Sequence, residues 1–164
     1  MKAFKPPAGL EVCSSSIHGR GCFTTREIKK GTRVLEYTGR RLRRQEANRI
    51  YHERPSTYLF VLADGQTVID GIGMASLVNH SCEPNCEPTE EDERIYLCAV
   101  KDIAAGEELT YDYNLTNSNE REMACHCDSK KCRGTMYSKE EMRRRKTRTQ
   151  PSGVPRSKKS RSSG

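Results

Sequence analysis

Cysteine is the residue that most limits what this chain can fold into. The sequence has eight cysteines in 164 residues, and three of them, Cys125, Cys127 and Cys132, lie within eight residues. The segment from Met1 to Leu10 has two lysines and two prolines but no apolar stretch of the kind found in secretory signals, so we expect an intracellular protein. In that setting a disulfide framework is disfavoured, and metal binding is the better interpretation.

The CxCx4C spacing supplies three of the four soft ligands that tetrahedral zinc requires. Free surface thiols are the alternative, and they are unfavourable in a polar loop because exposed thiols react readily. The cluster lacks a fourth ligand of its own. From the residues alone, Cys82, Cys86 and His126 are all candidates.

Charge is distributed unevenly along the chain. The formal net charge is +7, but residues 139–164 carry ten basic and two acidic residues, which leaves residues 1–138 at −1. A globally basic nucleic-acid-binding domain is therefore disfavoured, and a neutral domain with a basic arm is favoured. The arm has too few large apolar residues to bury, so we expect disorder after Ser138, with a short helical extension over 139–146 as an alternative.

The rest of the chain reads as short strands separated by glycine turns, with little helix. A helix is predicted over 42–54, ended by Pro55, and Asp64-Gly65 predicts a hairpin. The pattern around Ile28 recurs around Ile103, 75 residues later, as the same local turn chemistry used twice. Strands are predicted within 10–37 and over 57–63, 67–70, 95–100 and 109–113. No apolar run approaches the length of a membrane span.

Three further segments carry unusual chemistry. His18-Gly19-Arg20-Gly21 is either a strand-connecting turn or a place where backbone amides approach a ligand closely. The polar run from Asn79 to Cys86 could be a solvent loop, but the apolar residues 75–78 before it predict that it enters the interior, where its polar groups need partners. Tyr111 and Tyr113 share one strand face, either as ordinary packing or as phenols lining a channel.

Taken together, these segments resemble the SET-domain protein-lysine methyltransferases, and their motif sequences are most similar to those of the trithorax and mixed-lineage-leukaemia type. The resemblance runs in order from Leu10 to Met136, apart from a short insert between Arg40 and Pro55, and does not include the basic tail. It is carried by Ile17-His18-Gly19-Arg20-Gly21, Glu36-Tyr37-Thr38-Gly39, Asn79-His80-Ser81-Cys82-Glu83-Pro84-Asn85-Cys86, Gly106-Glu107-Glu108-Leu109-Thr110-Tyr111-Asp112-Tyr113 and the C-terminal cysteines.

The resemblance implies a mostly β structure with a few short helices: the SET β-clip fold, with a knot-like crossing near the C-terminal end and a small post-SET zinc module. The expected divisions are an N-terminal extension (1–9), a SET domain (10–116), the zinc module (117–137) and a disordered basic tail (138–164). The crossing would bring Cys82 to the cluster, so the implied zinc ligands are Cys82, Cys125, Cys127 and Cys132. Cys13, Cys22, Cys86 and Cys98 would remain reduced thiols.

The resemblance also implies S-adenosylmethionine as cofactor, bound by His18, Gly19, Arg20, Gly21, Tyr58, Asn79, His80 and His126. Tyr113 would lie near the transferring methyl group, and Tyr37 and Tyr111 would wall the lysine channel. Burial beside a sulfonium lowers the pKa of the substrate lysine, so that a neutral amine can attack. A tyrosine at position 111 predicts mainly mono-methylation.

The expected substrate is a histone tail or a histone-like basic protein. The alternatives are a non-histone ribosomal or nucleoid protein and, from another class, a catalytically silent scaffold that binds partners. The tail could be a solvated arm, a nucleic-acid contact, a nuclear import signal or a self-methylation target. An activating protein partner is plausible, and no membrane association is expected. The location would be the nucleus or chromosome in a eukaryote, and the cytoplasm or a secreted effector in a bacterium.

Overall fold

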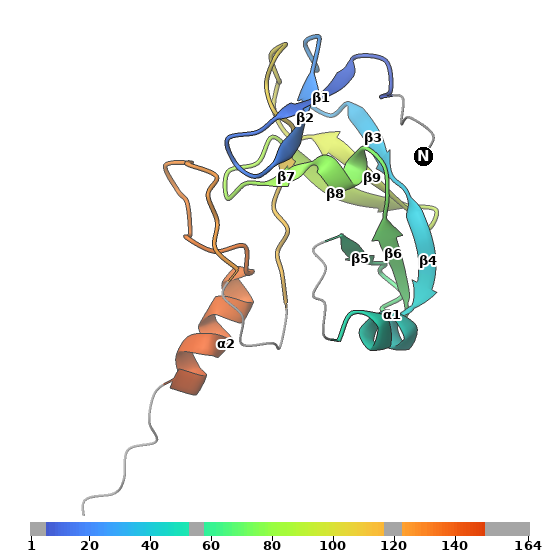
Figure 1. The fold of residues 1–164 in the computed structure, drawn as a ribbon, viewed down its shortest axis with the longest axis vertical. Helices are drawn as coiled ribbons and strands as arrows, with labels where there is room; N and C mark the ends of the chain where they lie inside the picture. Colours follow the sequence, from blue (N-terminus) through green and yellow to red (C-terminus); the bar gives the residue numbers. More distant parts are fainter. Residues whose placement is uncertain (1–5, 53–57, 117–122, 150–164) are drawn as a thin grey trace, which may run out of the picture.

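The computed structural model describes residues 6–52, 58–116 and 123–149. Short strands dominate, as the sequence predicts (Figure 1). The strands are β1 (Leu10–Ser14), β2 (Arg20–Thr24), β3 (Arg33–Tyr37), β4 (Gly39–Arg43), β5 (Leu59–Val61), β6 (Thr67–Gly71), β7 (Asn79–His80), β8 (Cys86–Glu91), β9 (Arg94–Ala99) and β10 (Thr110–Tyr111). The helices are α1 (Arg44–Ile50), α2 (Lys139–Thr149) and the 3₁₀ turn η1 (Ala75–Leu77).

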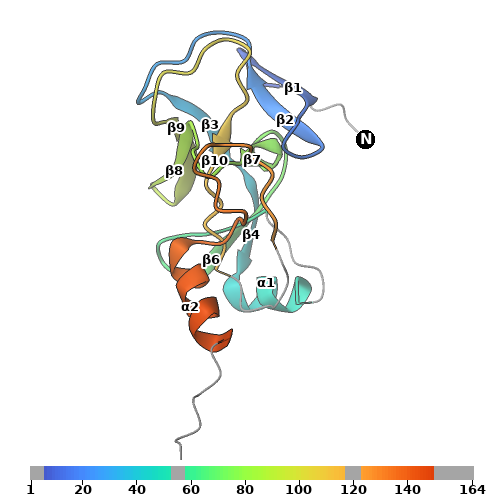
Figure 2. The ribbon, with the colours of Figure 1, turned by 90° about the vertical axis from the view of Figure 1, so that its left-hand side faces the viewer.

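The strands form small sheets rather than one continuous sheet. β1 and β2 make an antiparallel hairpin, β9 lies between β3 and β8, and β6 lies between β4 and β5. β7 and β10 form a short parallel pair, drawn side by side near the centre of Figure 2. This arrangement agrees with the mostly β, SET-like fold that the resemblance implies.

The β7–β10 pair is the expected crossing of the two motif segments. Asn79 is opposite Thr110, and His80 is opposite Tyr111. The amide side chain of Asn85 reinforces the crossing, because its Oδ1 accepts from the Thr110 N–H at 2.8 Å and its Nδ2 donates to the Glu108 carbonyl at 2.8 Å. The polar run that begins at Asn79 therefore enters the interior, as predicted, and finds its partners there.

The repeated isoleucine turns pair with each other in space. Ile28 and Ile103 exchange both backbone hydrogen bonds, at 2.9 and 2.8 Å, and both side chains are buried. Around them, alternate residues of β9 point inward, so that Ile95 and Leu97 enter the main core. A smaller cluster of Leu42, Ala47 and Val68 lies beneath α1.

The predicted helix over 42–54 begins too early. Leu42 belongs to β4, where it lies opposite Val68 of β6, and α1 starts only at Arg44. The sequence pattern of these residues is compatible with a helix, but β6 provides backbone hydrogen bonds to them, so residues 42 and 43 pair as a strand instead. The helix also ends earlier than predicted, at Ile50, with Tyr51 as its C-cap, and Pro55 lies outside the described residues.

The expected disorder directly after Ser138 is wrong, and the alternative of a helical extension over 139–146 is confirmed, because α2 is helical over Lys139–Thr149. The Ser138 hydroxyl accepts from the Glu141 N–H at 3.1 Å, as an N-cap does. Glu141 forms ion pairs with Arg144 and Arg145. The Arg145 guanidinium carbon lies 3.8 Å from the centroid of the Tyr137 ring. These contacts stabilise α2, although its sequence has few large apolar residues to bury. Residues 150–164 of the predicted tail lie outside the described residues.

The sequence predicts the β5–β6 hairpin but not the β8–β9 hairpin. The Asp64 carboxylate accepts hydrogen bonds from the Gln66 and Thr67 amides, and Gly65 has φ of 66°, so the predicted β5–β6 turn is confirmed. Strand β8 was not predicted. Its hairpin with β9 turns at Asp92 and Glu93, whose positive φ angles of 48° and 57° are unusual for these residue types. No helix within the described ranges is long and apolar enough to cross a bilayer.

Candidate functional site

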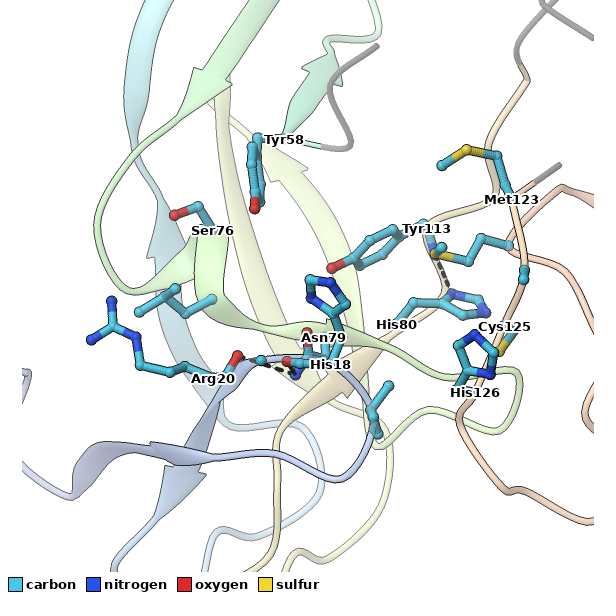
Figure 3. Close-up of a pocket in the computed structure, with 15 residues that line it drawn as sticks. His18, Arg20, Tyr58, Ser76, Asn79, His80, Tyr113, Met123, Cys125 and His126 are labelled. Carbon is cyan, nitrogen blue, oxygen red and sulfur yellow. Dashed lines mark hydrogen bonds between the residues drawn. The ribbon is translucent and has the colours of Figure 1, made fainter. Parts of the chain in front are cut away.

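A cavity of about 390 Å³ lies where the β1–β2 turn, β7, Tyr113 and the C-terminal cysteine segment meet. Side chains converge on it from segments far apart in the sequence, as Figure 3 shows. The lining residues are Ile17, His18, Gly19, Arg20, Tyr58, Ser76, Leu77, Asn79, His80, Tyr113, Met123, Ala124, Cys125, His126 and Met136. A cavity of this size suits a ligand of drug-like dimensions.

Most of the predicted cofactor residues line this cavity, and Gly21 does not. The lining includes His18, Gly19, Arg20, Tyr58, Asn79, His80 and His126, together with Tyr113. Sequence reasoning missed the apolar lining residues Ile17, Leu77, Met123, Ala124 and Met136, and also Ser76. Their side chains carry no chemistry that stands out in a sequence, and only the fold brings them to the cavity.

Gly21 serves a different purpose from close approach to a ligand. A side chain at this position would overlap the carboxylate of Glu108. That carboxylate accepts from the Ser15 hydroxyl at 2.9 Å and from the Asn79 Nδ2 at 2.7 Å. Gly21 therefore admits an acidic side chain that joins the β1–β2 hairpin to β7.

Asn79 fastens the β1–β2 turn against the crossing. Its Nδ2 also lies 3.2 Å from the carbonyl oxygens of His18 and Arg20. Because both donor hydrogens face the protein, the side-chain oxygen is the group that Asn79 can offer to a ligand.

Three tyrosines form a layer beside the cavity. The Tyr111 and Tyr113 rings have centroids 4.8 Å apart, and the Tyr113 hydroxyl donates to the Val78 carbonyl at 2.9 Å. The Tyr37 hydroxyl donates to the Tyr58 carbonyl at 3.0 Å, and it lies so close to Gly71 that a side chain there would clash. Of the three, only Tyr113 lines the cavity itself, and Tyr37 and Tyr111 are buried behind it.

Burial keeps these phenols protonated. It raises the pKa of Tyr37 to about 12, and it also raises the pKa of Tyr111 and of Tyr113 well above the ordinary value. None of the three can therefore act as a base near neutral pH. They can orient a polar group by hydrogen bonding and exclude water from it.

His80 connects the tyrosine layer to the cysteines. Burial lowers the pKa of His80 to about 4, with the nearby Asp112 opposing the shift and Arg133 adding to it. The neutral ring accepts the Tyr113 N–H at Nδ1, at 3.1 Å, and its Nε2 lies 3.4 Å from the Cys82 sulfur. This network assigns the proton to Nε2, where it can point to the sulfur.

The implied metal ligands are brought together. The Sγ atoms of Cys82, Cys125, Cys127 and Cys132 all lie within 4.8 Å of one another, and the Cys82 and Cys125 sulfurs are 3.8 Å apart. Tetrahedral zinc with bonds of about 2.3 Å separates its sulfur ligands by about 3.8 Å, so the donor set fits that ion. Cys86, an earlier candidate for the fourth ligand, is buried in the core, and His126 faces the cavity.

Amide hydrogen bonds favour thiolates in the cluster, whereas burial raises the pKa of Cys82 and of Cys125. The Arg133 N–H donates to the Cys82 sulfur at 3.3 Å, and the Gly134 N–H donates to the Cys132 sulfur at 3.4 Å. Burial opposes ionisation of Cys127, but hydrogen bonds from the Cys82 amide and from Ser129 lower its pKa to about 6. The other four cysteines are free thiols, as expected. Burial raises the pKa of Cys22 and of Cys86 to about 12.

His80 is expected to stay neutral far below the usual histidine range. Its folded-state pKa of about 4 lies below the unfolded value near 6.5, so the unfolded chain binds more protons between these two pH values. The contribution of His80 to the free energy of unfolding therefore decreases as the pH falls from 6.5 towards 4. Imidazole NMR should show the Nε2–H tautomer at pH 6, with the urea-unfolded chain as the reference. A midpoint for His80 near 6.5 in the folded protein would contradict this assignment.

Comparisons with known proteins agree with this geometry. Residues 19–114 match the SET domain family. The chain is 40% identical over 139 residues to "Histone-lysine N-methyltransferase ATX2" of Arabidopsis thaliana, and 38% identical over 133 residues to "Histone-lysine N-methyltransferase trithorax" of Drosophila virilis. These matches cover 77% and 74% of this chain but only 13% and 3% of the two relatives.

A solved structure shares the fold as well. The crystal structure of KRYPTONITE in complex with mCHG DNA and SAH superimposes with a TM-score of 0.66 at 29% identity, and the match covers 78% of this chain and 29% of that one. The sequence match extends over more than half of the chain and includes β2, the crossing and the tyrosine layer. This chain belongs to the SET domain family and is similar to its trithorax-type members.

Proposed function

We propose that this chain is an S-adenosylmethionine-dependent protein-lysine N-methyltransferase that acts on a histone tail or on another basic protein. The observation that carries the proposal is the buried tyrosine layer, which abuts a cavity large enough for a cofactor. The names of the relatives support the reaction class and a histone substrate. The proposed divisions are an N-terminal extension (1–9), a SET domain (10–116), a cysteine module (117–137) and a basic tail (138–164).

The lining of the cavity fits the proposed cofactor. Bound there, S-adenosylmethionine supplies a methyl group activated by its sulfonium charge. Gly19 has φ of 49°, and a side chain at this position would meet open space, so its backbone can border a ligand without steric conflict. The Asn79 side-chain oxygen can accept from a ligand amino group. His18 and Arg20 would bind from one side, and Tyr58, His80 and His126 would complete the walls.

The tyrosines act on the substrate lysine through burial. An ammonium group that leaves water for a site beside Tyr113, with Tyr37 and Tyr111 buried behind it, loses hydration, and its pKa falls. Because these phenols remain protonated, the released proton passes to solvent rather than to a tyrosine base. The neutral amine is then held in line for attack, and alignment supplies most of the rate enhancement.

Tyr113 has the orientation that methyl transfer needs. Its hydroxyl proton is donated to the Val78 carbonyl, so its oxygen lone pairs would be free to stabilise an electropositive group of the cofactor in the cavity. Tyr111 lies behind it with its hydroxyl retained, and this group would crowd an amine that already carries a methyl group. We therefore assign Tyr113 to transfer, and Tyr111 to a predominantly mono-methyl product.

Two tyrosine variants test the activity and the product. Tyr113→Phe should lower the methyl-transfer rate by about a hundredfold, because an oriented dipole at the transferring group is lost. Tyr111→Phe should remain active and shift the products towards di- and tri-methyl-lysine. The measurement is mass spectrometry of histones and of whole-cell basic proteins incubated with the enzyme and S-adenosylmethionine.

The matched control is Tyr96→Phe. Tyr96 lies on β9 beneath the Arg33 guanidinium, at 4.0 Å, away from the cavity, so activity should stay within about twofold. Labelling of ribosomal or nucleoid proteins in place of histones would favour the non-histone alternative. Absence of both methyl transfer and cofactor binding in the unmodified protein would overturn the proposal and favour the silent scaffold.

We assign zinc to the four-cysteine cluster, with a role in building the cavity. The cysteine segment contributes Met123, His126 and Met136 to the lining, so a bound ion that orders this segment would also complete the cofactor site. Zinc has no open coordination position among four sulfurs, which is typical of a structural site.

Removal of one ligand should remove the metal. Metal analysis should find one zinc per chain in the unmodified protein and in Cys13→Ser, an exposed cysteine of β1 outside the cluster. Cys125→Ser should contain much less, and S-adenosylhomocysteine should bind it at least about tenfold more weakly in calorimetry. Full zinc occupancy in Cys125→Ser would contradict the ligand assignment.

The basic arm is proposed to contact nucleic acid. Lys139, Arg143 and Lys146 recur at helical spacing on one exposed side of α2. Of the two acidic residues of α2, Glu141 is buried against Arg144 and Arg145 and Glu140 is exposed, so the basic residues of the helix still outnumber the acidic ones. KRYPTONITE was crystallised with DNA. A chromosomal location suits both the arm and the relatives.

Salt dependence tests this contact. If Lys139, Arg143 and Lys146 each neutralise one phosphate, replacing all three with glutamine should reduce the slope of log K against log salt by about 2.7 for duplex DNA. The matched control replaces the exposed Lys30, Arg94 and Lys101 with glutamine and should leave the slope unchanged. Equal effects of the two triple variants would indicate non-specific attraction and overturn the assignment to α2.

A further inference from the structure

An ion pair with little solvent exposure joins the cysteine segment to residues Tyr111–Tyr113, of which only Tyr111 belongs to β10. The Arg133 Nη1 and Nη2 atoms each donate to one carboxylate oxygen of Asp112, both at 2.7 Å. The two side chains are only 12% and 20% exposed. This forked geometry fixes the orientation of both groups as well as their distance, which a single contact would not do.

Arg133 and Asp112 are sequence neighbours of the cysteine cluster and of the tyrosine layer, respectively. Arg133 directly follows the cysteine Cys132, and its own backbone N–H donates to the Cys82 sulfur. Asp112 lies between Tyr111 and Tyr113 in the chain. The pair therefore connects the cysteine cluster with the tyrosine layer through one side-chain contact.

Desolvation of the Arg133–Asp112 pair has a free-energy cost, so the pair is a poor means of stabilising the fold alone. The Arg133 Nε is buried and has no partner within the described ranges, so this one N–H gives up hydration without a replacement hydrogen bond. Replacing a buried ion pair with apolar residues is often neutral or stabilising. What such a replacement could not reproduce is the single orientation that the two parallel hydrogen bonds impose.

We propose that Arg133 is a positioning residue: by holding Asp112 in a fork, it fixes the cysteine segment against residues Tyr111–Tyr113 and so sets the separation of the two cavity walls. One wall carries Met123, His126 and Met136, and the other carries Tyr113. The effect on catalysis rests on the methyltransferase function proposed above. The effect on the order of the cysteine segment does not.

The test compares Arg133→Met, Arg133→Lys and Asp112→Asn. We expect kcat for a lysine substrate to fall about tenfold in Arg133→Met and in Asp112→Asn, with KM changed less than about twofold, because alignment rather than substrate binding is lost. Arg133→Lys keeps the charge but loses the fork, so it should recover only part of kcat. The double variant should be no slower than about the slower single variant, since both changes break one contact.

Lys131→Met is the matched control. Lys131 lies two residues away and also forms an ion pair with the crossing segment, through Glu83 at 3.2 Å, but its side chain is 83% exposed. It should leave kcat unchanged. Hydrogen exchange of residues 123–137 should be about tenfold faster in Arg133→Met and unchanged in Lys131→Met. This readout needs no activity, so it decides the positioning role even if the unmodified protein transfers no methyl group.

Three results would overturn the proposal. The first is unchanged kcat and exchange in Arg133→Met. The second is an equal loss in Lys131→Met, and the third is full multiplication of the single losses in the double variant. If Arg133→Met does not fold, Arg133→Lys at low temperature decides, because wild-type kcat and exchange in that variant would show that the fork is dispensable.

Discussion

The parallel pairing of β7 with β10 is the contact on which the site depends. It joins residues 79–80 to residues 110–111, so that two polar segments about thirty residues apart become neighbours in the interior. Neither strand is long enough to be stable alone, and the side chains of Asn79 and Asn85 supply the further hydrogen bonds that hold the crossing. From this place one segment leads to the cysteine Cys82 and the other to Tyr113.

Buried and half-buried polar side chains in this protein form hydrogen bonds between segments that are distant in the sequence. Glu108 joins the β1–β2 hairpin to Asn79, His80 joins the tyrosine layer to Cys82, and Asp112 joins that layer to Arg133. Each of them would be costly without its partner. Since the cavity walls come from separate segments with little regular structure between them, side-chain hydrogen bonds define their relative positions where a continuous sheet would otherwise do so.

Parts of the fold that rest on local chemistry could be predicted, and parts that rest on competition between segments could not. The Asp64-Gly65 hairpin and the buried β9 strand follow from turn residues and β-forming side chains. The start of α1 was wrong because Leu42 finds a partner in Val68, which no local pattern records. The sequence offered α2 only as an alternative to disorder, because its order depends on Ser138, Glu141 and the Tyr137 ring acting together.

By itself, the sequence determined the types of chemistry available: three clustered thiols, a polar run that must be satisfied inside, two phenols two residues apart, and a basic arm on a nearly neutral domain. These follow from composition and spacing, which are properties of the chain alone. Only the tertiary structure decided that Cys82 completes the cluster, that Met123 and Met136 wall the cavity, and that Asp112 meets Arg133. Each of those contacts joins residues more than ten positions apart, so it exists only once the chain has folded back on itself.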